Sequence, residues 1–193
     1  INDLYDVHLE KAAEAVKETR GVSPAVYKNY EDLLADKNVD AVYIASSWDE
    51  HIRMAVKAMY AGKITAMEVG GAYELEECWE LVRAYEATKT PFMFMENCCF
   101  DYFELLATTL VRRGMLGEIV HCHGAYGHDL RSEIMGGKIN QHYRLQNYKK
   151  RNCENYPTHE LGPIAKILNL NRGNRIMSVS SLSSKAAGLK AYT

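Results

Sequence analysis

The sequence has no long hydrophobic run. No apolar stretch approaches the ~20 residues of a membrane-spanning helix, and no signal peptide is visible at the start of the chain. We therefore expect no membrane partner. The chain opens on Ile1 rather than methionine, which leaves an upstream export signal open.

The sequence also lacks a disulfide framework. Its five cysteines are odd in number, Cys98 and Cys99 are adjacent, and no Cys-x-x-Cys motif occurs. Small secreted proteins normally carry an even set of paired cysteines. The pattern therefore indicates reduced thiols and a cytoplasmic location.

Neither sign of charge is in excess. Together, 23 Lys and Arg nearly balance 25 Asp and Glu, which gives a net charge of −2 and predicts no special attraction to nucleic acid. The one basic run, 149–151, is interpreted as a solvated loop. The 47% hydrophobic content is typical of a globular protein, and 193 residues suffice for one domain or two small ones.

A glycine-rich phosphate loop is missing, although the first half has the pattern of a nucleotide-binding fold. Apolar β-forming runs alternate with amphipathic helices, which predicts βαβ units and a parallel sheet. Strands are expected at 27–30, 40–47, 63–68 and 91–97, and helices at 6–20, 31–36, 49–61 and 75–88. We interpret residues 1–98 as a partial Rossmann domain of α/β class, whose first strand and glycine loop would lie upstream of Ile1.

The pattern changes after residue 100. Residues 127–155 are polar with little periodicity, and a stretch of this length is usually functional or disordered. Around it we expect helices at 102–113 and 157–170 and strands at 118–126 and 175–184. Residues 99–193 are therefore expected to form part of an α+β domain with an antiparallel sheet, for substrate binding or oligomerisation. The whole chain is interpreted as a fragment truncated at both ends.

Polar or unusual residues follow each strand of the expected parallel sheet. They are Ser46–Trp48, Glu68–Gly70 and Glu96–Asn97, and ligands of such sheets bind at the carboxyl ends of the strands. Trp48 would pack on a cofactor ring or else lie at the surface. His51 would approach the same ligand or else cap its helix, and the spacing alone does not separate these alternatives.

Two other features have both a functional and a structural interpretation. Asp3 precedes a helix, so it would either cap that helix or accept hydrogen bonds from a cofactor ribose. His121 and His123 would share one face of a strand, but no third ligand for zinc is evident nearby. We therefore expect no metal.

A group of polar and aromatic residues marks the second half: Tyr126, His128, Arg144, Tyr156 and His159. Tyr156 and His159 are three residues apart and would share one helix face. Neutral histidine and tyrosine can exchange protons with sugar hydroxyls, and Arg144 can hold an oxyanion or an acyl group. The alternative is a purely structural hydrogen-bonded cluster.

Several motifs resemble a known family. The segments S-W-D-E-H-I-R-M-A, A-G-K-I-T-A-M-E and M-E-N are similar to Gfo/Idh/MocA oxidoreductases from their second strand onward. More narrowly, E-N-C-C-F, G-E-I-V-H-C-H-G-A-Y-G-H-D-L-R, Y-P-T-H-E-L-G-P and N-R-G-N-R resemble glycoside hydrolase family 109 and its close relatives. The resemblance spans nearly all 193 residues.

The resemblance implies tightly held NAD and a small carbohydrate substrate, and it leaves a homo-oligomer open. It implies that Asp3 holds the ribose, and that the rest of the cofactor contacts Trp48, His51, Glu68, Val69, Asn97 and Tyr156. It implies that the sugar contacts Tyr126, Arg144, Tyr156, Pro157, Thr158 and His159. Within that group, His159 and Tyr156 would be the catalytic residues.

One departure separates this chain from ordinary dehydrogenases of the superfamily. These usually have Glu-Lys-Pro at the end of the third strand, and the lysine helps to move the alcohol proton. This chain has Glu68-Val69-Gly70 instead, and valine cannot carry a proton. The hydrolase branch also has Glu-Val, whereas Gly70-Gly71 replaces its more usual Pro-Ala, which leaves the exact sugar open.

The resemblance thus implies a glycosidase that borrows redox chemistry from NAD. Carbon C3 of an α-N-acetylgalactosaminide or related sugar would be oxidised while His159 or Tyr156 accepts the hydroxyl proton. Elimination at C1, addition of water and re-reduction of C3 would follow, and no pair of hydrolytic carboxylates would be required. The alternatives are an NAD(P)-dependent sugar or polyol dehydrogenase, and a non-catalytic sugar- or cofactor-binding sensor.

Overall fold

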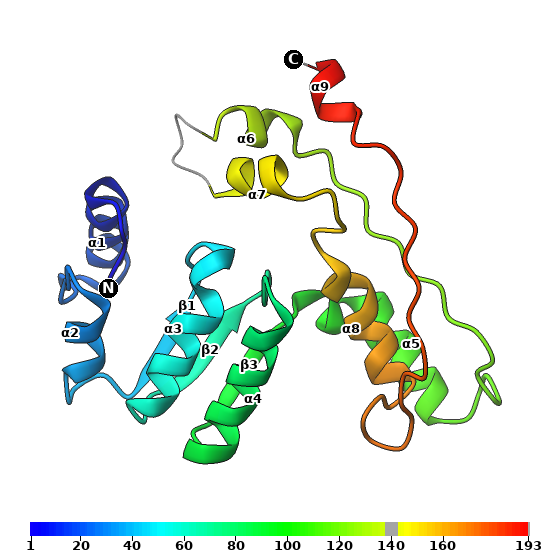
Figure 1. Ribbon diagram of the computed structural model, residues 1–193. Helices are drawn as coiled ribbons and strands as arrows, with labels where there is room; N and C mark the ends of the chain where they lie inside the picture. The colour runs from blue at the N-terminus through cyan, green and yellow to red at the C-terminus, as the bar shows by residue number, and fades with distance from the viewer. Residues whose placement is uncertain (138–142, 193) are drawn as a thin grey trace. The chain divides into compact units, whose positions relative to one another are not determined.

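The computed structural model describes residues 1–137 and 143–192. The chain divides into two compact units, Ile1–Phe94 and Met95–Thr193. Each unit has its own helices, which Figure 1 follows along the chain from blue to red. The boundary expected at residue 98 stays a prediction.

The first unit is a three-stranded sheet with helices in its crossovers (Figure 1). Its elements are α1 (Asp6–Arg20), α2 (Tyr30–Ala35), β1 (Ala41–Ile44), α3 (Trp48–Tyr60), β2 (Ile64–Glu68), α4 (Leu75–Thr88) and β3 (Phe92–Met95). The strand order is β1-β2-β3, and β1 pairs with β2 in parallel, Ala41 opposite Ile64 and Ile44 opposite Met67. The α/β class and the Rossmann-like parallel sheet that the sequence predicts are therefore confirmed.

The core of this unit lies between α3 and the sheet. Alternate residues of β1 and β2 are buried, as the period of two in a strand requires. They pack against Ile52, Ala55 and Ala58 from one face of α3. Each large apolar side chain buried in this way stabilises the fold by about 1.5–3 kcal/mol, so these contacts fix where the carboxyl ends of the strands lie.

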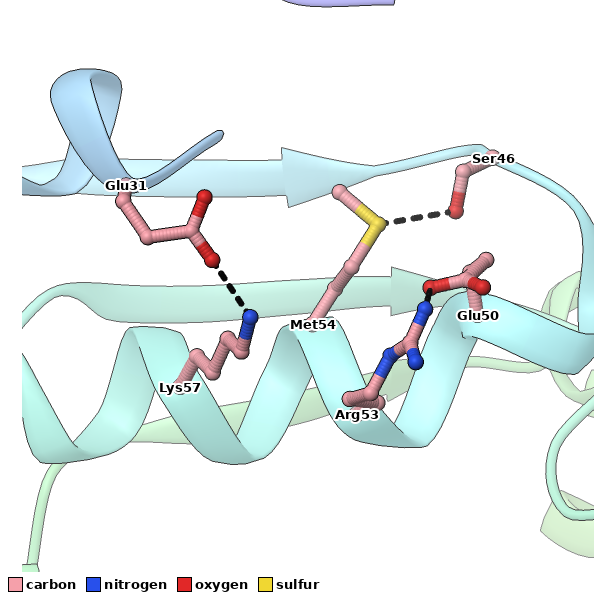
Figure 2. Close-up of polar contacts among 6 residues, drawn as sticks. All are labelled: Glu31, Ser46, Glu50, Arg53, Met54 and Lys57. Atoms are coloured by element: carbon pink, nitrogen blue, oxygen red, sulfur yellow. Dashed lines mark hydrogen bonds and ion pairs between the residues drawn. The ribbon is translucent and has the colours of Figure 1, made fainter. Parts of the chain in front are cut away.

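Polar contacts join side chains of α3 to one another and to its neighbours (Figure 2). Lys57 forms an ion pair with Glu31 of α2, and Arg53 forms one with Glu50 a turn earlier. The Ser46 hydroxyl donates a hydrogen bond to the Met54 sulfur at 3.2 Å. The two exposed ion pairs contribute roughly 0–1 kcal/mol each, and of the two the Lys57–Glu31 pair links α3 to α2.

The second unit is helical in the residues that the structure describes. Its elements are a 3-10 helix η1 (Asn97–Phe100), α5 (Tyr102–Arg112), α6 (Arg131–Met135), α7 (Arg144–Lys150), α8 (Pro157–Ile167) and α9 (Gly188–Tyr192). Helix α8 packs against η1 and α5, and α6 packs against α7. Pro157 occupies the first helical position of α8, where its missing N–H costs nothing and its fixed φ suits the helix.

The antiparallel sheet expected in the second half is wrong for the described residues. The segments 118–126 and 175–184 carry no strand, and an isolated bridge between Leu170 and Asn174 is the β-pairing there. Val120, Val179 and Leu182 alternate with polar residues but are exposed. A strand exists only where a neighbouring backbone accepts and donates its hydrogen bonds, and alternation alone does not supply that neighbour.

Two local expectations also need correction. The strand expected at 27–30 is wrong, because Tyr30 begins helix α2. The stretch 127–155 contains α6 and α7 rather than a loop alone, with residues 138–142 outside the described part of the chain. Within residues 1–137 and 143–192, no helix combines the length and the apolar character needed to cross a membrane.

The packing of β2 against α3 predicts that two methionines contribute very differently to the free energy of unfolding. Met67 of β2 is 1% exposed, whereas Met93 of β3 is 50% exposed. Met67→Ala should therefore lower the free energy of unfolding by about 2–5 kcal/mol. Met93→Ala should cost less than about 1 kcal/mol. Denaturant unfolding measures both, and equal losses would contradict this account of the core.

Candidate functional site

Helix α8 begins with a tyrosine and a histidine whose rings stack. Tyr156 directly precedes the helix, and its carbonyl accepts the His159 backbone N–H at 3.1 Å. The two ring centroids are 4.8 Å apart and the ring planes differ by only 6°. The turn that Pro157 starts therefore places both side chains on one face, as the i, i+3 spacing predicts.

Glu96 contacts the Nδ1 edge of the His159 ring. Its Oε1 lies 2.6 Å from His159 Nδ1, and both side chains are only 6% exposed. The same Oε1 accepts the Cys98 backbone N–H at 3.0 Å at the start of η1. The sequence marks Glu96 as a strand end but does not place it among the site residues. Its position where β3 ends is the available signal.

Arg144 contacts the oxygen of Tyr156. Its Nε donates to Tyr156 Oη at 3.0 Å, and its terminal nitrogens contact the same oxygen and form an ion pair with Glu133 of α6. Arg144 and Tyr156 are therefore brought together from α7 and from the start of α8. Glu133 is a second residue that the sequence does not single out, because its pattern does not predict α6.

Tyr126 completes the aromatic group. Its ring centroid lies 4.6 Å from that of His159 and 5.4 Å from that of Tyr156, tilted against both. Its backbone N–H donates to Glu160 Oε1 at 2.6 Å. Burial raises the pKa of the Tyr126 phenol, so this group stays protonated and can donate a hydrogen bond. Tyr126, Tyr156 and His159 are called the tyrosine–histidine cluster below.

The structure places the other candidate residues of the second unit as follows. His128 meets the Tyr126 ring edge-on at 6.2 Å between centroids. Pro157 is exposed and Thr158 is half-buried in the first turn of α8. His121 and His123 are both exposed.

The first unit holds a separate group at the ends of β1 and β2. Trp48 is 5% exposed and packs against Gly70, whose φ is 104°. A Cβ at Gly70 would lie 1.8 Å from Trp48 Cδ1. The indole is therefore a buried contact between α3 and the end of β2, and only glycine leaves room for it.

His51 and Glu68 lie at the same ends of β1 and β2. His51 Nε2 is 2.9 Å from the Ser46 carbonyl, while its buried Nδ1 has no partner within the described residues. Burial lowers the pKa of His51, so the ring is neutral and Nε2 donates. Glu68 accepts the Tyr43 hydroxyl at 2.5 Å and the Val69 N–H at 3.3 Å.

The other two predicted cofactor residues sit elsewhere. Asp3 accepts the Tyr5 N–H at 2.9 Å and lies 3.3 Å from His8 Nδ1, just before α1. Asn97 is the first residue of η1, in the second unit. Their roles towards a cofactor stay predictions.

Comparison with known proteins identifies both halves. Residues 1–95 match the oxidoreductase family with an NAD-binding Rossmann fold, Gfo/Idh/MocA. Residues 101–193 match the C-terminal domain of glycosyl hydrolase 109. The chain joins a Gfo/Idh/MocA Rossmann domain to a glycosyl hydrolase 109 C-terminal domain.

Proteins that are similar to this chain come from several bacteria. It is 41% identical over 163 residues to a glycosyl hydrolase family 109 protein of Solibacter usitatus, covering 84% of this chain and 37% of the relative. It is 37% identical to an alpha-N-acetylgalactosaminidase of Bacteroides fragilis, and the match covers 98% of this chain and 46% of that relative. The chain thus spans less than half the length of these relatives.

Solved structures share the fold. A myo-inositol 2-dehydrogenase from Lactobacillus plantarum superposes with a TM-score of 0.66 at 23% identity, over 86% of this chain and 47% of that one. An NAD-binding protein from Listeria innocua gives a TM-score of 0.53 at 29% identity, and the match covers 67% of this chain and 38% of that one.

The contact between Gly70 and Trp48 predicts that replacement by alanine destabilises the protein more at Gly70 than at the adjacent Gly71. Gly70→Ala should cost about 1–3 kcal/mol, because the indole must move and alanine is strained at this φ. A Cβ at Gly71 would meet nothing within 4 Å, and its φ is ordinary, so Gly71→Ala should stay within about 0.5 kcal/mol. Denaturant unfolding compares the two, and equal effects would disprove the close packing.

The burial of His51 predicts a pH dependence of stability. Its pKa is lowered from the ordinary value of 6.5, so below that pH the unfolded chain binds a proton that the folded one resists. The free energy of unfolding should then fall as the pH drops below 6.5, by up to ~1.4 kcal/mol per pH unit from this group. In His51→Gln, whose amide can still donate to Ser46, this component should be absent. Parallel slopes for both proteins would contradict the assignment.

Proposed function

We propose that the protein to which this chain belongs is an NAD-dependent, sugar-active enzyme, and specifically a glycosidase acting on α-N-acetylgalactosaminides or closely related sugars. The observation that supports this most is the stacked Tyr156 and His159 at the start of α8, backed by Arg144 on one side and Glu96 on the other. The tyrosine–histidine cluster would supply a proton acceptor and two phenols, and Arg144 adds a positive charge beside Tyr156. The alpha-N-acetylgalactosaminidase of Bacteroides fragilis provides the substrate class by similarity.

The ends of β1 and β2 fit an NAD cofactor. His51 has a buried ring nitrogen with no partner in the described part of the chain, and a Cβ at Gly71, just after β2, would meet only open space. Trp48, His51, Glu68 and Val69 would line the cofactor there, with Asp3 at the ribose. The family resemblance also assigns cofactor contacts to Asn97 and Tyr156. When bound, the NAD would accept a hydride from a sugar carbon and return it at the end of the cycle.

The side chains of the cluster then have separate tasks. His159 Nε2, the nitrogen opposite the Glu96 contact, would accept the proton of the reacting hydroxyl. Tyr156 Oη accepts hydrogen bonds from Arg144, and this oxygen would face the sugar. Tyr126 would donate a second hydrogen bond, and Pro157 and Thr158 would shape the sugar-facing turn.

Val69 favours this function over that of an ordinary dehydrogenase. A valine follows Glu68 at the end of β2, so no lysine ammonium is available there to take the alcohol proton. The proton must pass to another group, and His159 with Tyr156 supplies one. The second candidate, a sugar or polyol dehydrogenase, would release net NADH, and the third, a sensor, would bind without turnover.

The proposal predicts that the aryl group of a glycoside is released without net reduction of NAD. The full-length protein, given an aryl α-N-acetylgalactosaminide, should release the aryl group while NADH absorbance stays flat. His159→Ala should lower kcat by about 10²–10⁴-fold, because no other group replaces the proton acceptor, and should leave NAD bound. His121→Ala, an exposed histidine of the same unit, should retain the wild-type rate.

The other outcomes separate the alternatives. Accumulation of NADH from free sugars, without aryl release, would establish the dehydrogenase. Binding of NAD with neither signal would leave the sensor. A near-normal rate in His159→Ala would remove that residue from the catalytic role.

A further inference from the structure

The contact between Glu96 and His159 joins two segments that lie far apart in the chain. The residues are 63 positions apart, at the end of β3 and in the first turn of α8, and their side chains are buried together. An Nδ1–Oε1 distance of 2.6 Å is that of a short, charge-assisted hydrogen bond. A carboxylate has no proton to give, so His159 Nδ1 carries the hydrogen and donates it to Glu96.

We propose that Glu96 is a positioning residue for His159. By accepting the Nδ1–H, it fixes the tautomer in which Nε2 keeps a free lone pair, and it stabilises the imidazolium that forms when Nε2 takes a proton. This inference rests on the proposed function, in which His159 accepts the proton of a sugar hydroxyl. The logic is that of a carboxylate that orients a catalytic histidine without itself becoming protonated.

The surroundings of Glu96 suit this task. Oε1 is already held by the Cys98 N–H, which aims the carboxylate at the ring. Oε2 is buried with no partner among the described residues, and an unpaired buried carboxylate oxygen is costly unless a positive charge compensates it. A protonated His159 would provide that charge, so the pair gains most at the moment when the histidine has accepted a proton.

Gly162 allows α8 to approach Glu96. It lies three residues after His159, on the same face of the helix. A Cβ there would be 2.8 Å from Glu96 Cγ and 2.9 Å from Cys99 Sγ, closer than side chains normally pack. The His-x-x-Gly spacing in T-H-E-L-G-P therefore serves one contact, because the histidine meets the carboxylate where the glycine leaves room for it.

A metal ion could use the same three side chains, and the geometry argues against it. One ligand atom each from Glu96, Cys98 and His159 lies within 4.8 Å of the others. Nitrogen and oxygen ligands of a tetrahedral zinc would be about 3.4 Å apart, well beyond the observed 2.6 Å. Burial, followed by the Glu96 charge, raises the pKa of the Cys98 thiol to about 11, whereas a zinc ligand must be the thiolate.

The tautomer of His159 tests the proposal directly. Two-bond proton–nitrogen NMR spectra of the full-length, ¹⁵N-histidine-labelled protein should show a protonated Nδ1 and an unprotonated Nε2 for one ring. That signal should vanish in His159→Gln. A proton on Nε2 instead would overturn the proposal, and the readout does not depend on finding a substrate.

Kinetics of Glu96→Gln give the second test. Glutamine keeps the size but removes the charge, so kcat for the aryl glycoside should fall on the order of 10²-fold while KM stays close to the wild-type value. The same variant should lose the fixed tautomer in the NMR spectrum. Glu118→Gln, an exposed glutamate of the same unit, is the matched control and should change neither. Wild-type kcat in Glu96→Gln would overturn the proposal.

Two further arms keep the outcomes distinct. Gly162→Ala, which crowds Glu96 without touching the ring, should weaken the Nδ1–H signal, and Gly127→Ala, with nothing within 4 Å of the added carbon, should not. Stoichiometric zinc in the purified protein, lost together with the tautomer on chelation, would replace the dyad with a metal site. If the wild-type protein is inactive on glycosides but shows the Nδ1–H tautomer, the proposed substrate fails and the dyad stands.

Discussion

The buried hydrogen bond between Glu96 and His159 is the interaction on which the second unit's site depends. It links Glu96, the residue before η1, to the first turn of α8, and the second carboxylate oxygen of Glu96 is buried with no partner among the described residues. Removing Glu96 would leave the buried Nδ1–H of His159 without its acceptor, which costs more than the bond itself contributes. The start of α8 is therefore fixed by a polar contact, and the stack of Tyr156 on His159 follows from the helix geometry.

Charge is balanced separately on each side of the tyrosine–histidine cluster. Glu96 faces His159, and Glu133 pairs with Arg144, whose guanidinium contacts the Tyr156 oxygen. Negative charge thus lies behind the proton acceptor and positive charge behind the phenol. A base is favoured where a carboxylate can stabilise its protonated form, and a donor is favoured where a cation polarises its oxygen. The two groups can therefore share one helix face and still differ in their tasks.

The sequence predicts local patterns better than distant pairings. Helix α4 is expected at 75–88 and is found at Leu75–Thr88, because its periodicity and its flanking residues suffice to define it. The shared face of Tyr156 and His159 is likewise predictable, since i, i+3 spacing is a local property. The antiparallel strands are wrong because alternation at 118–126 does not reveal which backbone would pair with it. Glu96 escapes prediction as a site residue for the same reason, since its partner lies 63 residues away.

Val69 and Glu96 both bear on which group would accept the proton in the proposed reaction. In the dehydrogenases that the first half of the chain resembles, a lysine follows the glutamate that corresponds to Glu68 and helps to move the alcohol proton. Here Glu68 instead accepts the Tyr43 hydroxyl and the Val69 N–H, and the valine side chain that follows it cannot carry a proton. In the proposed function, His159 at the start of α8 would supply proton transfer, and it would need one fixed tautomer to act repeatedly within a cycle. A histidine free to rotate would present the wrong nitrogen part of the time. A valine in place of the lysine thus gives the Glu96 carboxylate beside His159 a larger part in the proposed chemistry.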